Sequence, residues 1–411
     1  MNSESSRRNF LAAGLALPAA ALANPTTTAS PAPAQAQAAP ANAKLTWRTL
    51  GKTGLKVTSL SFGCMTTSDP SVIEHAADLG IVHFDTARSY QNGNNERMVG
   101  AALKGRRKQV ILSSKSLAKT KAEALAELET SLRELATDYL DIWYLHNKLD
   151  PAEVTDDLLE AQRIAKQQGK IRFAGMTTHF NMDRMLPYAA KLGQFDVVLT
   201  TYNFAMRGVD ANANTNPNAP KSDMTGAIRQ ARQAGVGVVT MKALAGGVRR
   251  VAVGDRLYGA NPQELTKRLS QPGVPVAAIR WVLQNQSVDT AIVCMADHDQ
   301  LEENMRAMAE PYSSKDEQVL AQHLAVIGPT YCRMCGACNG VCDKGVPVPE
   351  VLRYLTYAEG YGQFPMARQK FLDLPDPVRA IRCADCTTCS VDCPHGVAVR
   401  DRVALAQDLF A

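Results

Sequence analysis

The chain has 411 residues, of which 45% are hydrophobic and 21% are charged, and its formal net charge is +5. This composition is ordinary for a globular protein with a sizeable core. The small charge excess predicts no acidic partner, so binding to nucleic acid is not indicated. The length allows two or three domains.

The first residues predict an export signal. The pair Arg7 and Arg8 precedes an apolar Ala/Leu segment that ends in small residues, with an A-x-A cleavage site at Ala21 and Ala23. This pattern resembles a twin-arginine signal peptide over residues 1–23. It predicts that the protein is exported, already folded, to the periplasm. The alternative interpretation is a disordered alanine-rich tail.

The Pro/Ala/Thr-rich stretch 24–44 predicts a flexible linker, because it cannot bury a core. The apolar part of the signal is short for a membrane span, and no later stretch is long and apolar enough to cross a bilayer. We therefore expect the mature protein to have no membrane span and its folded part to begin at residue 45.

Residues 45–311 alternate short apolar strands with amphipathic segments. Leucines in 121–136, for example, repeat at intervals of three to four residues, as on one face of a helix. Eight such units fit an α/β fold of the TIM barrel type, (β/α)8, better than an open doubly wound sheet, and no G-x-G-x-x-G motif follows any strand. The expected strands are SLSFGC, VHFDT, VILSSK, LDIWYLH, IRFAGM, DVVLTTYN, GVVTMKAL and TAIVCM.

Polar side chains follow three consecutive expected strands. Asp85 and Tyr90 follow the second strand, Lys115 ends the third, and His146 ends the fourth. The polar, Asn/Pro-rich segment 203–223 predicts a loop after the sixth strand. Each polar residue alone is explained as a satisfied structural group, but barrel active sites lie at these carboxyl ends. Their combination therefore predicts an active site there.

With these four residues, the opening RTLGKTGLKVTSLSFG and the segment GKIRFAGMTTH, the chain resembles the aldo/keto reductase family over residues 47–306. The resemblance implies an oxidoreductase that interconverts a carbonyl and an alcohol, with a small-molecule substrate and NAD(P)H as a possible cofactor. It also implies that Asp85, Tyr90, Lys115 and His146 form the catalytic tetrad.

The chemistry explains why such a tetrad is needed. A carbonyl that accepts hydride develops negative charge on oxygen, and a tyrosine with a pKa of about 10 is a poor proton donor at neutral pH. We expect Lys115 to lower the pKa of Tyr90, Asp85 to hold the ammonium, and His146 to orient the carbonyl oxygen.

The family resemblance also assigns cofactor-binding residues. It places Thr177 and Thr178 at the nicotinamide carboxamide and Glu303 and Asn304 near the adenine, with Lys242 beside the position that stacks on nicotinamide.

Four further positions depart from the family pattern. Cys294 and Gln300 stand where basic residues usually hold the 2′-phosphate of NADP, Leu199 replaces a glutamine, and Met241 replaces the stacking aromatic residue. We therefore expect a reduced preference for NADP and weaker nicotinamide binding. Cys64 and Cys294, both within strands, are interpreted as core residues.

The last hundred residues carry the same cysteine spacing twice. C-x2-C-x2-C-x3-C occurs in 332–342 and in 383–393. This spacing is typical of the bacterial two-cluster ferredoxin run, in which each [4Fe-4S] cluster takes three thiolates from one run and one from the other. Zinc binding and disulfides, which an oxidising periplasm allows, are the alternatives. Pro394 follows Cys393 as in the motif, whereas Asp343 follows Cys342.

On the ferredoxin pattern the two clusters have separate ligand sets. The first set is Cys332, Cys335, Cys338 and Cys393, and the second is Cys383, Cys386, Cys389 and Cys342. Apolar residues at helical intervals between the runs predict a mostly helical ferredoxin-like domain over residues 312–411. With this tail, the chain resembles the iron–sulfur branch of the aldo/keto reductase family.

Hydride carries two electrons, whereas each cluster exchanges one, and this mismatch leaves three interpretations open. In the first, the barrel is the reductase, with a nicotinamide bound before export, and the clusters relay electrons or stabilise the protein. In the second, the protein is a periplasmic electron-transfer protein whose barrel binds a redox protein partner or an acceptor rather than NAD(P)H. In the third, the clusters only fasten the tail across the barrel mouth.

Overall fold

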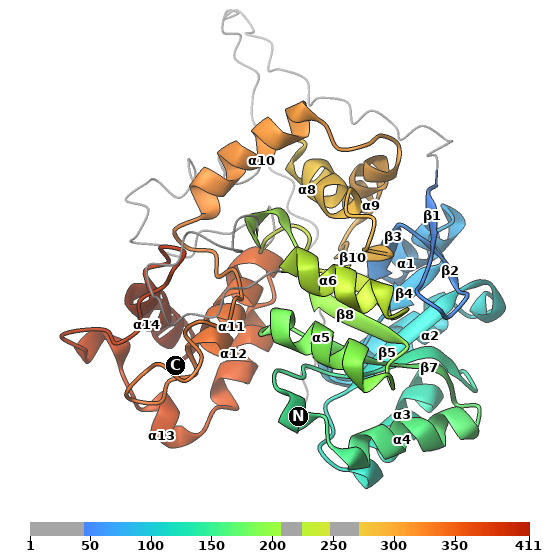
Figure 1. Cartoon of the computed structure of the whole chain (residues 1–411), viewed down its shortest axis with the longest axis horizontal. Helices are drawn as coiled ribbons and strands as arrows, with labels where there is room; N and C mark the ends of the chain where they lie inside the picture. Colours follow the sequence, from blue (N-terminus) through green and yellow to red (C-terminus); the bar gives the residue numbers. More distant parts are fainter. Residues whose placement is uncertain (1–44, 207–223, 247–270) are drawn as a thin grey trace, which may run out of the picture. The chain divides into compact units, whose positions relative to one another are not determined.

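The computed structural model describes residues 45–206, 224–246 and 271–411. The predicted signal peptide and linker, residues 1–44, and residues 207–223 of the predicted loop lie outside the described residues. Two regions follow one another along the described chain (Figure 1): a strand–helix barrel and a helical tail.

Eight parallel strands close into a barrel in the order β10-β3-β4-β5-β6-β7-β8-β9, which confirms the TIM barrel prediction. Strands β5 and β6 are buried along their whole length, as expected for parallel strands covered by helices. The strands are β3 (Leu60–Gly63), β4 (His83–Asp85), β5 (Ile111–Ser116), β6 (Leu140–Leu145), β7 (Ile171–Thr178), β8 (Val197–Thr201), β9 (Gly237–Met241) and β10 (Thr290–Cys294).

Helices alternate with these strands and bury their apolar faces against them. Helix α3 begins with a capping box, in which the Thr120 hydroxyl accepts a hydrogen bond from the backbone N–H of Glu123 at 3.3 Å and the Glu123 carboxylate accepts one from the N–H of Thr120 at 3.2 Å. The described barrel helices are α1 (Pro70–Asp78), α2 (Asn94–Ala102), α3 (Lys121–Glu134), α4 (Asp156–Gln167), α5 (Met182–Leu192), α6 (Met224–Gln233), α8 (Val274–Leu283) and α9 (His298–Met305).

An antiparallel hairpin, β1 (Trp47–Thr49) and β2 (Lys56–Thr58), closes the amino end of the barrel. Leu50 in its turn is fully buried among side chains that face the barrel interior. Gly51 has a φ of +50°, and a Cβ there would lie 2.3 Å from the backbone nitrogen of Gly237, at the start of β9. The turn therefore needs glycine, and only the carboxyl end of the barrel is left for a site.

The tail is helical, as predicted, and has a hydrophobic core of its own. Whether it is ferredoxin-like stays a prediction. No helix within the described ranges is long and apolar enough to cross a membrane. The tail helices are α10 (Ser314–Ile327), α11 (Val348–Tyr361), α12 (Phe364–Leu372), α13 (Asp376–Arg379) and α14 (Val399–Phe410).

The barrel and the tail share a hydrophobic cluster and belong to one compact unit of the chain. Phe204 and Val274 of the barrel are buried in this cluster together with Ile327 and Tyr331 of the tail. The side-chain amide of Asn203 donates a hydrogen bond to the Tyr331 hydroxyl at 3.0 Å. The tail therefore packs onto the barrel as part of the same fold.

Candidate active site

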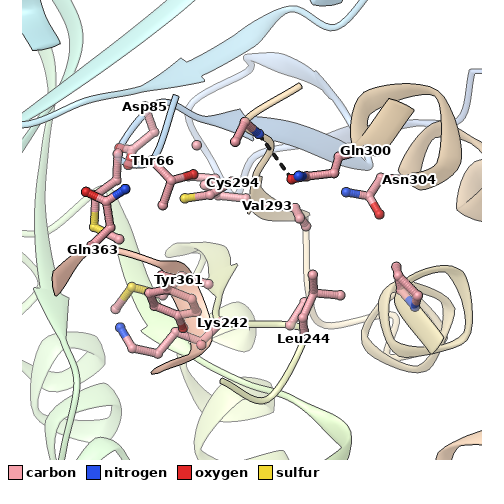
Figure 2. A pocket seen from close by; sticks show the side chains of 18 of the residues that line it. Thr66, Asp85, Lys242, Leu244, Val293, Cys294, Gln300, Asn304, Tyr361 and Gln363 are labelled. Carbon is pink, nitrogen blue, oxygen red and sulfur yellow. Dashed lines mark hydrogen bonds between the residues drawn. The ribbon is translucent and has the colours of Figure 1, made fainter. Parts of the chain in front are cut away.

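A cavity of about 320 Å³ lies at the carboxyl ends of the barrel strands (Figure 2). Its wall combines strand ends, among them Asp85 and Cys294, with Gln300 and Asn304 of helix α9. Tyr361 closes it from the tail. The cavity is in the size range of small-molecule sites and lies where barrel enzymes place their chemistry.

A chain of hydrogen bonds joins three of the four predicted catalytic residues. The Lys115 ammonium donates to Asp85 Oδ2 at 2.5 Å, to the Thr86 carbonyl oxygen at 2.6 Å and to the Tyr90 hydroxyl at 3.3 Å. Asp85 is 3% exposed and Lys115 2%. Tyr90 and Asp85 both line the cavity, so the hydrogen-bonded residues reach the space that a substrate would enter.

The barrel register brings these residues together. Asp85 ends β4 and pairs with Ser113 of β5, two residues before Lys115, so both charged side chains point into the same end of the barrel. The Ser113 hydroxyl donates to Asp85 Oδ1 at 2.6 Å. Each carboxylate oxygen of Asp85 therefore accepts a hydrogen bond, which fixes the position of the carboxylate.

Tyr90 is positioned by a strained turn. It begins the 3₁₀ helix Tyr90–Gly93, in which Gln91 and Asn92 have φ values of 49° and 53°. The Gln91 side chain donates to the carbonyl oxygen of Thr67 at 2.8 Å, which holds the turn against the loop after β3. Left-handed backbone at residues other than glycine is uncommon and is often found at functional sites.

The pKa of Tyr90 differs from the sequence-based expectation. Burial raises this pKa well above its usual value, and the negative charge of Asp85 raises it further. The expectation of a lowered pKa is wrong for this structure, because burial disfavours the phenolate and Asp85 offsets much of the positive charge of the Lys115 ammonium. Tyr90 is therefore a protonated phenol at neutral pH.

His146 lies beside Tyr90, with the two ring centroids 6.1 Å apart in an edge-on arrangement. Burial lowers its pKa well below the usual value, and the positive charge of Lys115 lowers it further. Its Nδ1 is buried and has no hydrogen-bond partner in the described part of the chain. The ring is thus neutral and keeps hydrogen-bonding capacity for a ligand.

The predicted cofactor-binding residues divide into two groups. Lys242, Glu303 and Asn304 line the cavity. Thr177 and Thr178 do not contribute to its lining: the Thr177 hydroxyl accepts from the backbone N–H of Asn147 at 2.8 Å, and the Thr178 hydroxyl donates to the Phe180 carbonyl oxygen at 2.7 Å. Both threonine hydroxyls therefore brace the loops behind the cavity.

The four positions that depart from the family pattern all line the cavity: Leu199, Met241, Cys294 and Gln300. Cys64 is fully buried in the core, as expected. The interpretation of Cys294 as a core residue is wrong, because β10 ends at Cys294 and its partly exposed side chain lines the cavity. Neutral side chains thus form this part of the wall.

Gln300 is held in place by its own helix cap. Its side chain donates to Asp297 Oδ2 at 2.6 Å and accepts from the backbone N–H of Ala296 at 3.1 Å, the contact drawn in Figure 2. Asp297 caps helix α9. A carboxylate at this helix end disfavours an added phosphate there.

Tail residues in the cavity wall were missed from the sequence. Gly360, Tyr361, Gly362 and Gln363 line the cavity from the end of α11. Gly362 has a φ of +64° and ends the helix. The only signal was the pair of glycines in a segment otherwise predicted helical, and that signal marks a helix end without showing what it covers.

Four tail cysteines, Cys332, Cys335, Cys338 and Cys393, line one small cavity. Burial raises the pKa of the Cys332 thiol, and the neighbouring Cys338 adds to this effect. Burial raises the pKa of Cys338 to about 12. The Cys332 and Cys338 thiols are therefore protonated at neutral pH and would lose their protons on binding a metal.

The remaining four cysteines of the two runs form a second neighbourhood. Burial raises the pKa of Cys383 to about 11, with Cys386, Cys342 and Cys389 as the next causes. All eight thiols are free. Within the described residues, no three His, Cys, Asp or Glu side chains stand close enough to hold a metal ion. The sulfurs are grouped, but they do not form a closed ligand shell.

The model of the aldo/keto reductase family matches residues 66–325, more than half of the chain. The chain belongs to the aldo/keto reductase family of oxidoreductases. The match contains all four residues of the tetrad and ends inside α10, before the first cysteine run. The cysteine-rich part of this aldo/keto reductase thus lies beyond the family match.

Several relatives match most of the barrel. L-glyceraldehyde 3-phosphate reductase of Escherichia coli (strain K12) is 25% identical over 69% of this chain and 93% of its own length. L-galactose dehydrogenase of Arabidopsis thaliana is 26% identical over 70% and 95%. The uncharacterized oxidoreductase YqkF of Bacillus subtilis (strain 168) is 32% identical over 148 residues, and the chain spans about half of that protein, 48%.

A solved structure agrees with the fold. Aldo-keto reductase AKR11C1 from Bacillus halodurans, in its holo form, superimposes with a TM-score of 0.53 and 25% identity. The superposition covers 68% of this chain and 96% of that one. The barrel of this aldo/keto reductase therefore corresponds to nearly the whole of a family member, and the tail is additional.

Proposed function

We propose that this aldo/keto reductase interconverts a carbonyl and an alcohol in the cavity, with Tyr90 as the proton donor to the carbonyl oxygen. The observation that carries the proposal is the hydrogen-bonded chain of Asp85, Lys115 and Tyr90, which ends at the cavity wall. A phenol that stays protonated donates its proton as negative charge develops on the oxygen, and the adjacent ammonium stabilises the phenolate that remains. His146 orients the carbonyl oxygen.

A nicotinamide cofactor supplies the hydride when bound. Its binding in the cavity is supported by the lining, which extends from the tetrad to Glu303 and Asn304 of helix α9, the residues that we propose for the adenine end. We propose Lys242 as a third cofactor contact, supported by Thr177 and Thr178 from behind. Neutral Cys294 and Gln300 leave NADP without its usual basic anchors, which supports use of NADH at least as well as NADPH.

Replacing Tyr90 with Phe tests the catalytic assignment. We expect kcat to fall by a factor of about 10² to 10⁴, because the proton donor is removed while the ring and its packing remain. The measurement is aldehyde-dependent oxidation of NADH and NADPH, with Tyr188→Phe on helix α5 as the matched control. Turnover retained by Tyr90→Phe would rule out Tyr90 as the donor.

We propose that the tail holds two [4Fe-4S] clusters. The donor chemistry supports this: eight free thiols lie in two neighbourhoods, and each neighbourhood contains three cysteines of one run and one of the other. In two-cluster ferredoxins, each cluster likewise takes three cysteine ligands from one run and the fourth from the other. The first cluster would be held by Cys332, Cys335, Cys338 and Cys393, and the second by Cys342, Cys383, Cys386 and Cys389. Iron–sulfur clusters supply one-electron transfer when bound.

We favour a relay of electrons between the barrel and a redox protein partner. In this relay a two-electron intermediary, such as a quinone-like acceptor, takes the hydride and passes its two electrons to the two clusters one at a time. The first thiol group adjoins the barrel: Cys332 packs against both the barrel core and the tail core. A structural cluster that fastens the tail is the alternative role. A pure electron-transfer protein is a second candidate function, which the missing basic anchors at Cys294 and Gln300 favour.

An anaerobic titration with NADH and NADPH separates these roles. The purified protein is titrated while cluster absorbance and electron spin resonance are followed. Nicotinamide binding with cluster reduction is the expected result. Binding without cluster reduction assigns the clusters a structural role, and the absence of binding by either nicotinamide assigns the protein to electron transfer. Cys335→Ser should lower the iron content from about eight to about four per chain, and Cys294→Ser should leave it unchanged.

We propose further that the chain is exported through the twin-arginine route and works in the periplasm, with residues 45–311 as the barrel domain and 312–411 as the ferredoxin-like domain. The twin-arginine pattern at Arg7 and Arg8 supports export. Loading of clusters before export is consistent with a route that carries folded proteins. Fractionation of cells that express the chain with Arg7 and Arg8 replaced by Lys tests the route.

A further inference from the structure

Lys242 lies at the inner end of the cavity in an environment that the proposed reaction does not explain. It directly follows β9 with a φ of +61°, and its ammonium nitrogen is 3.2 Å from His179 Nδ1. The same nitrogen lies 5.6 Å from the ring centroid of Tyr357, on tail helix α11. Figure 2 shows the Lys242 side chain extending away from Gln300. Its charged end therefore lies on the side of the catalytic residues.

The distances connect Lys242 to the reacting end of the cavity. The ring of His179 is 6.3 Å from that of His146, and the ring of His146 is 6.1 Å from that of Tyr90. A carbonyl oxygen held between Tyr90 and His146 would thus be separated from the Lys242 ammonium by the rings of His146 and His179. A second polar group on a short substrate can reach it.

Groups of both charge signs face Lys242. Arg353 of α11 and Lys115 of β5 lower its pKa, whereas Glu350 of α11 and Cys294 of β10 raise it. Burial is the largest cause, and the resulting pKa of Lys242 is about 7. Burying a second cation beside Arg353 without its own anion is unfavourable, and loss of the proton is the usual response.

The nearby carboxylate is already engaged. Glu350 forms an ion pair with Arg353, and Arg353 also donates to the Tyr357 hydroxyl at 2.8 Å. No carboxylate of residues 45–206, 224–246 and 271–411 pairs with Lys242. Arg353 is 5% exposed, and its Nε has no hydrogen-bond partner in the same ranges. The site therefore offers a buried lysine that pairs with no described carboxylate, next to an arginine whose Nε has no described partner.

We propose that the cavity selects carbonyl compounds that also carry an anionic group, a carboxylate or a phosphate, and that Lys242 binds this group beside His179 and Arg353. The proposal rests on the proposed carbonyl reduction and specifies its substrate class. Pairing with an anion restores the charged form of Lys242 and offsets the cost of its burial. The anionic oxygens could also belong to the pyrophosphate of a nicotinamide cofactor, and the experiment separates the two sources.

The test compares succinic semialdehyde with butanal, two four-carbon aldehydes that differ in the carboxylate. The wild type should favour succinic semialdehyde by at least about tenfold in kcat/KM, which corresponds to one charge-assisted contact. Lys242→Met should remove most of this preference, and Lys242→Arg should retain part of it. Lys148→Met is the matched control, because Lys148 is a buried lysine that does not line the cavity.

The remaining possible results either overturn the anion-binding proposal or distinguish its failure from the failure of the proposed carbonyl reduction. A preference that survives in Lys242→Met overturns it. An unchanged preference together with a raised KM for the nicotinamide also overturns it, and leaves Lys242 as a contact of the cofactor alone. If the wild type reduces neither aldehyde, the proposed function fails, and calorimetric titration with succinate and with inorganic phosphate at pH 8 decides the anion site alone. Binding with proton uptake that is lost in Lys242→Met supports the site, and absence of binding overturns it.

Discussion

Ion pairs and hydrogen bonds around Tyr90 leave little freedom to the catalytic groups. Lys115 donates to three oxygen atoms, and Asp85 accepts from both Lys115 and Ser113. The ion pair is buried, so removing one partner would leave an uncompensated charge. A substrate entering the cavity thus meets a proton donor whose position is already fixed.

His83 stands behind this group. Its ring is fully buried, and its Nε2 lies 3.1 Å from the hydroxyl of Ser113, the residue that donates to Asp85. Burial lowers the pKa of His83 to about 4, although the charges of Asp85 and Asp141 raise it in part. The folded protein therefore keeps this histidine neutral at pH values where the unfolded chain protonates it.

Replacing His83 with Leu should remove an acid-dependent loss of stability. The pKa of His83 is about 4 in the folded protein and about 6.5 in the unfolded chain. The stability that depends on a neutral His83 ring is therefore fully present above pH 6.5 and is lost as the pH falls toward 4. The free energy of unfolding of the wild type should fall by about 3 kcal/mol relative to His83→Leu between about pH 7 and pH 4. Urea unfolding at both pH values measures it. A difference that is the same at both pH values would contradict the low pKa.

Helix α11 forms the part of the cavity wall that the barrel does not provide. It contributes Gly360 and Tyr361 to the lining, and Arg353 and Tyr357 surround Lys242. A Cβ on Gly360 would lie 1.6 Å from the carbonyl oxygen of Gly246 in the barrel. The helix can approach the barrel this closely only because residue 360 has no side chain.

Gly360→Ala should therefore displace α11 from the barrel mouth. The clash is with backbone, so it cannot be relieved by rotating a side chain, and the wall of the cavity must shift. We expect faster hydrogen exchange in residues 348–361 and at least about a tenfold rise in KM for the aldehyde. Gly193→Ala is the control, because its φ of +70° adds strain but a Cβ there meets nothing within 4 Å. Equal effects of the two substitutions would show that the contact with Gly246 is not important.

Barrel and tail depend on each other across the whole molecule. The cluster that they share contains Phe204 and Val274 from the barrel and Leu320, Ile327 and Tyr331 from the tail. Removing the tail would expose apolar side chains that no other described element covers, and would open the cavity. The tail is therefore part of the folding unit of the reductase.

A chain that ends at residue 328 tests this dependence. It keeps helix α10 but loses Tyr331 and helix α11, so we expect strong binding of a hydrophobic dye and loss of most aldehyde reduction. The full chain with Tyr331→Phe is the control, since it keeps the ring and removes the hydroxyl that accepts the hydrogen bond from Asn203. An active, monomeric, non-dye-binding truncation would show that the barrel folds and works alone.

The barrel and the tetrad could be predicted because their signals are local. Each strand reads as an apolar run, and the polar residue at its end, such as Asp85 or Lys115, follows from position within one strand–helix unit. The closed register then brings residues thirty positions apart into hydrogen-bond contact. Once the strand–helix repeat is recognised, the closed barrel topology determines which of these polar residues lie together.

The pKa of Tyr90 and the part of the cavity wall that α11 contributes could not be predicted in the same way. The pKa depends on how deeply the ring is buried, which is set by packing from several elements. Gly360 reaches the cavity from more than a hundred residues beyond Met241, and nothing in its neighbouring sequence identifies that target. Cys294 was misassigned for the same reason: its strand position is evident, but the open space beside it is not.

The late position of α11 in the chain has a consequence for biosynthesis. A ribosome makes the eight barrel strands first and Gly360 only near the end of the chain. A growing chain therefore contains Tyr90 long before helix α11 is present to complete the wall of the cavity. Nascent and prematurely terminated chains would present an open, solvent-filled barrel mouth. The complete wall of the cavity is therefore available only after most of the chain has been made.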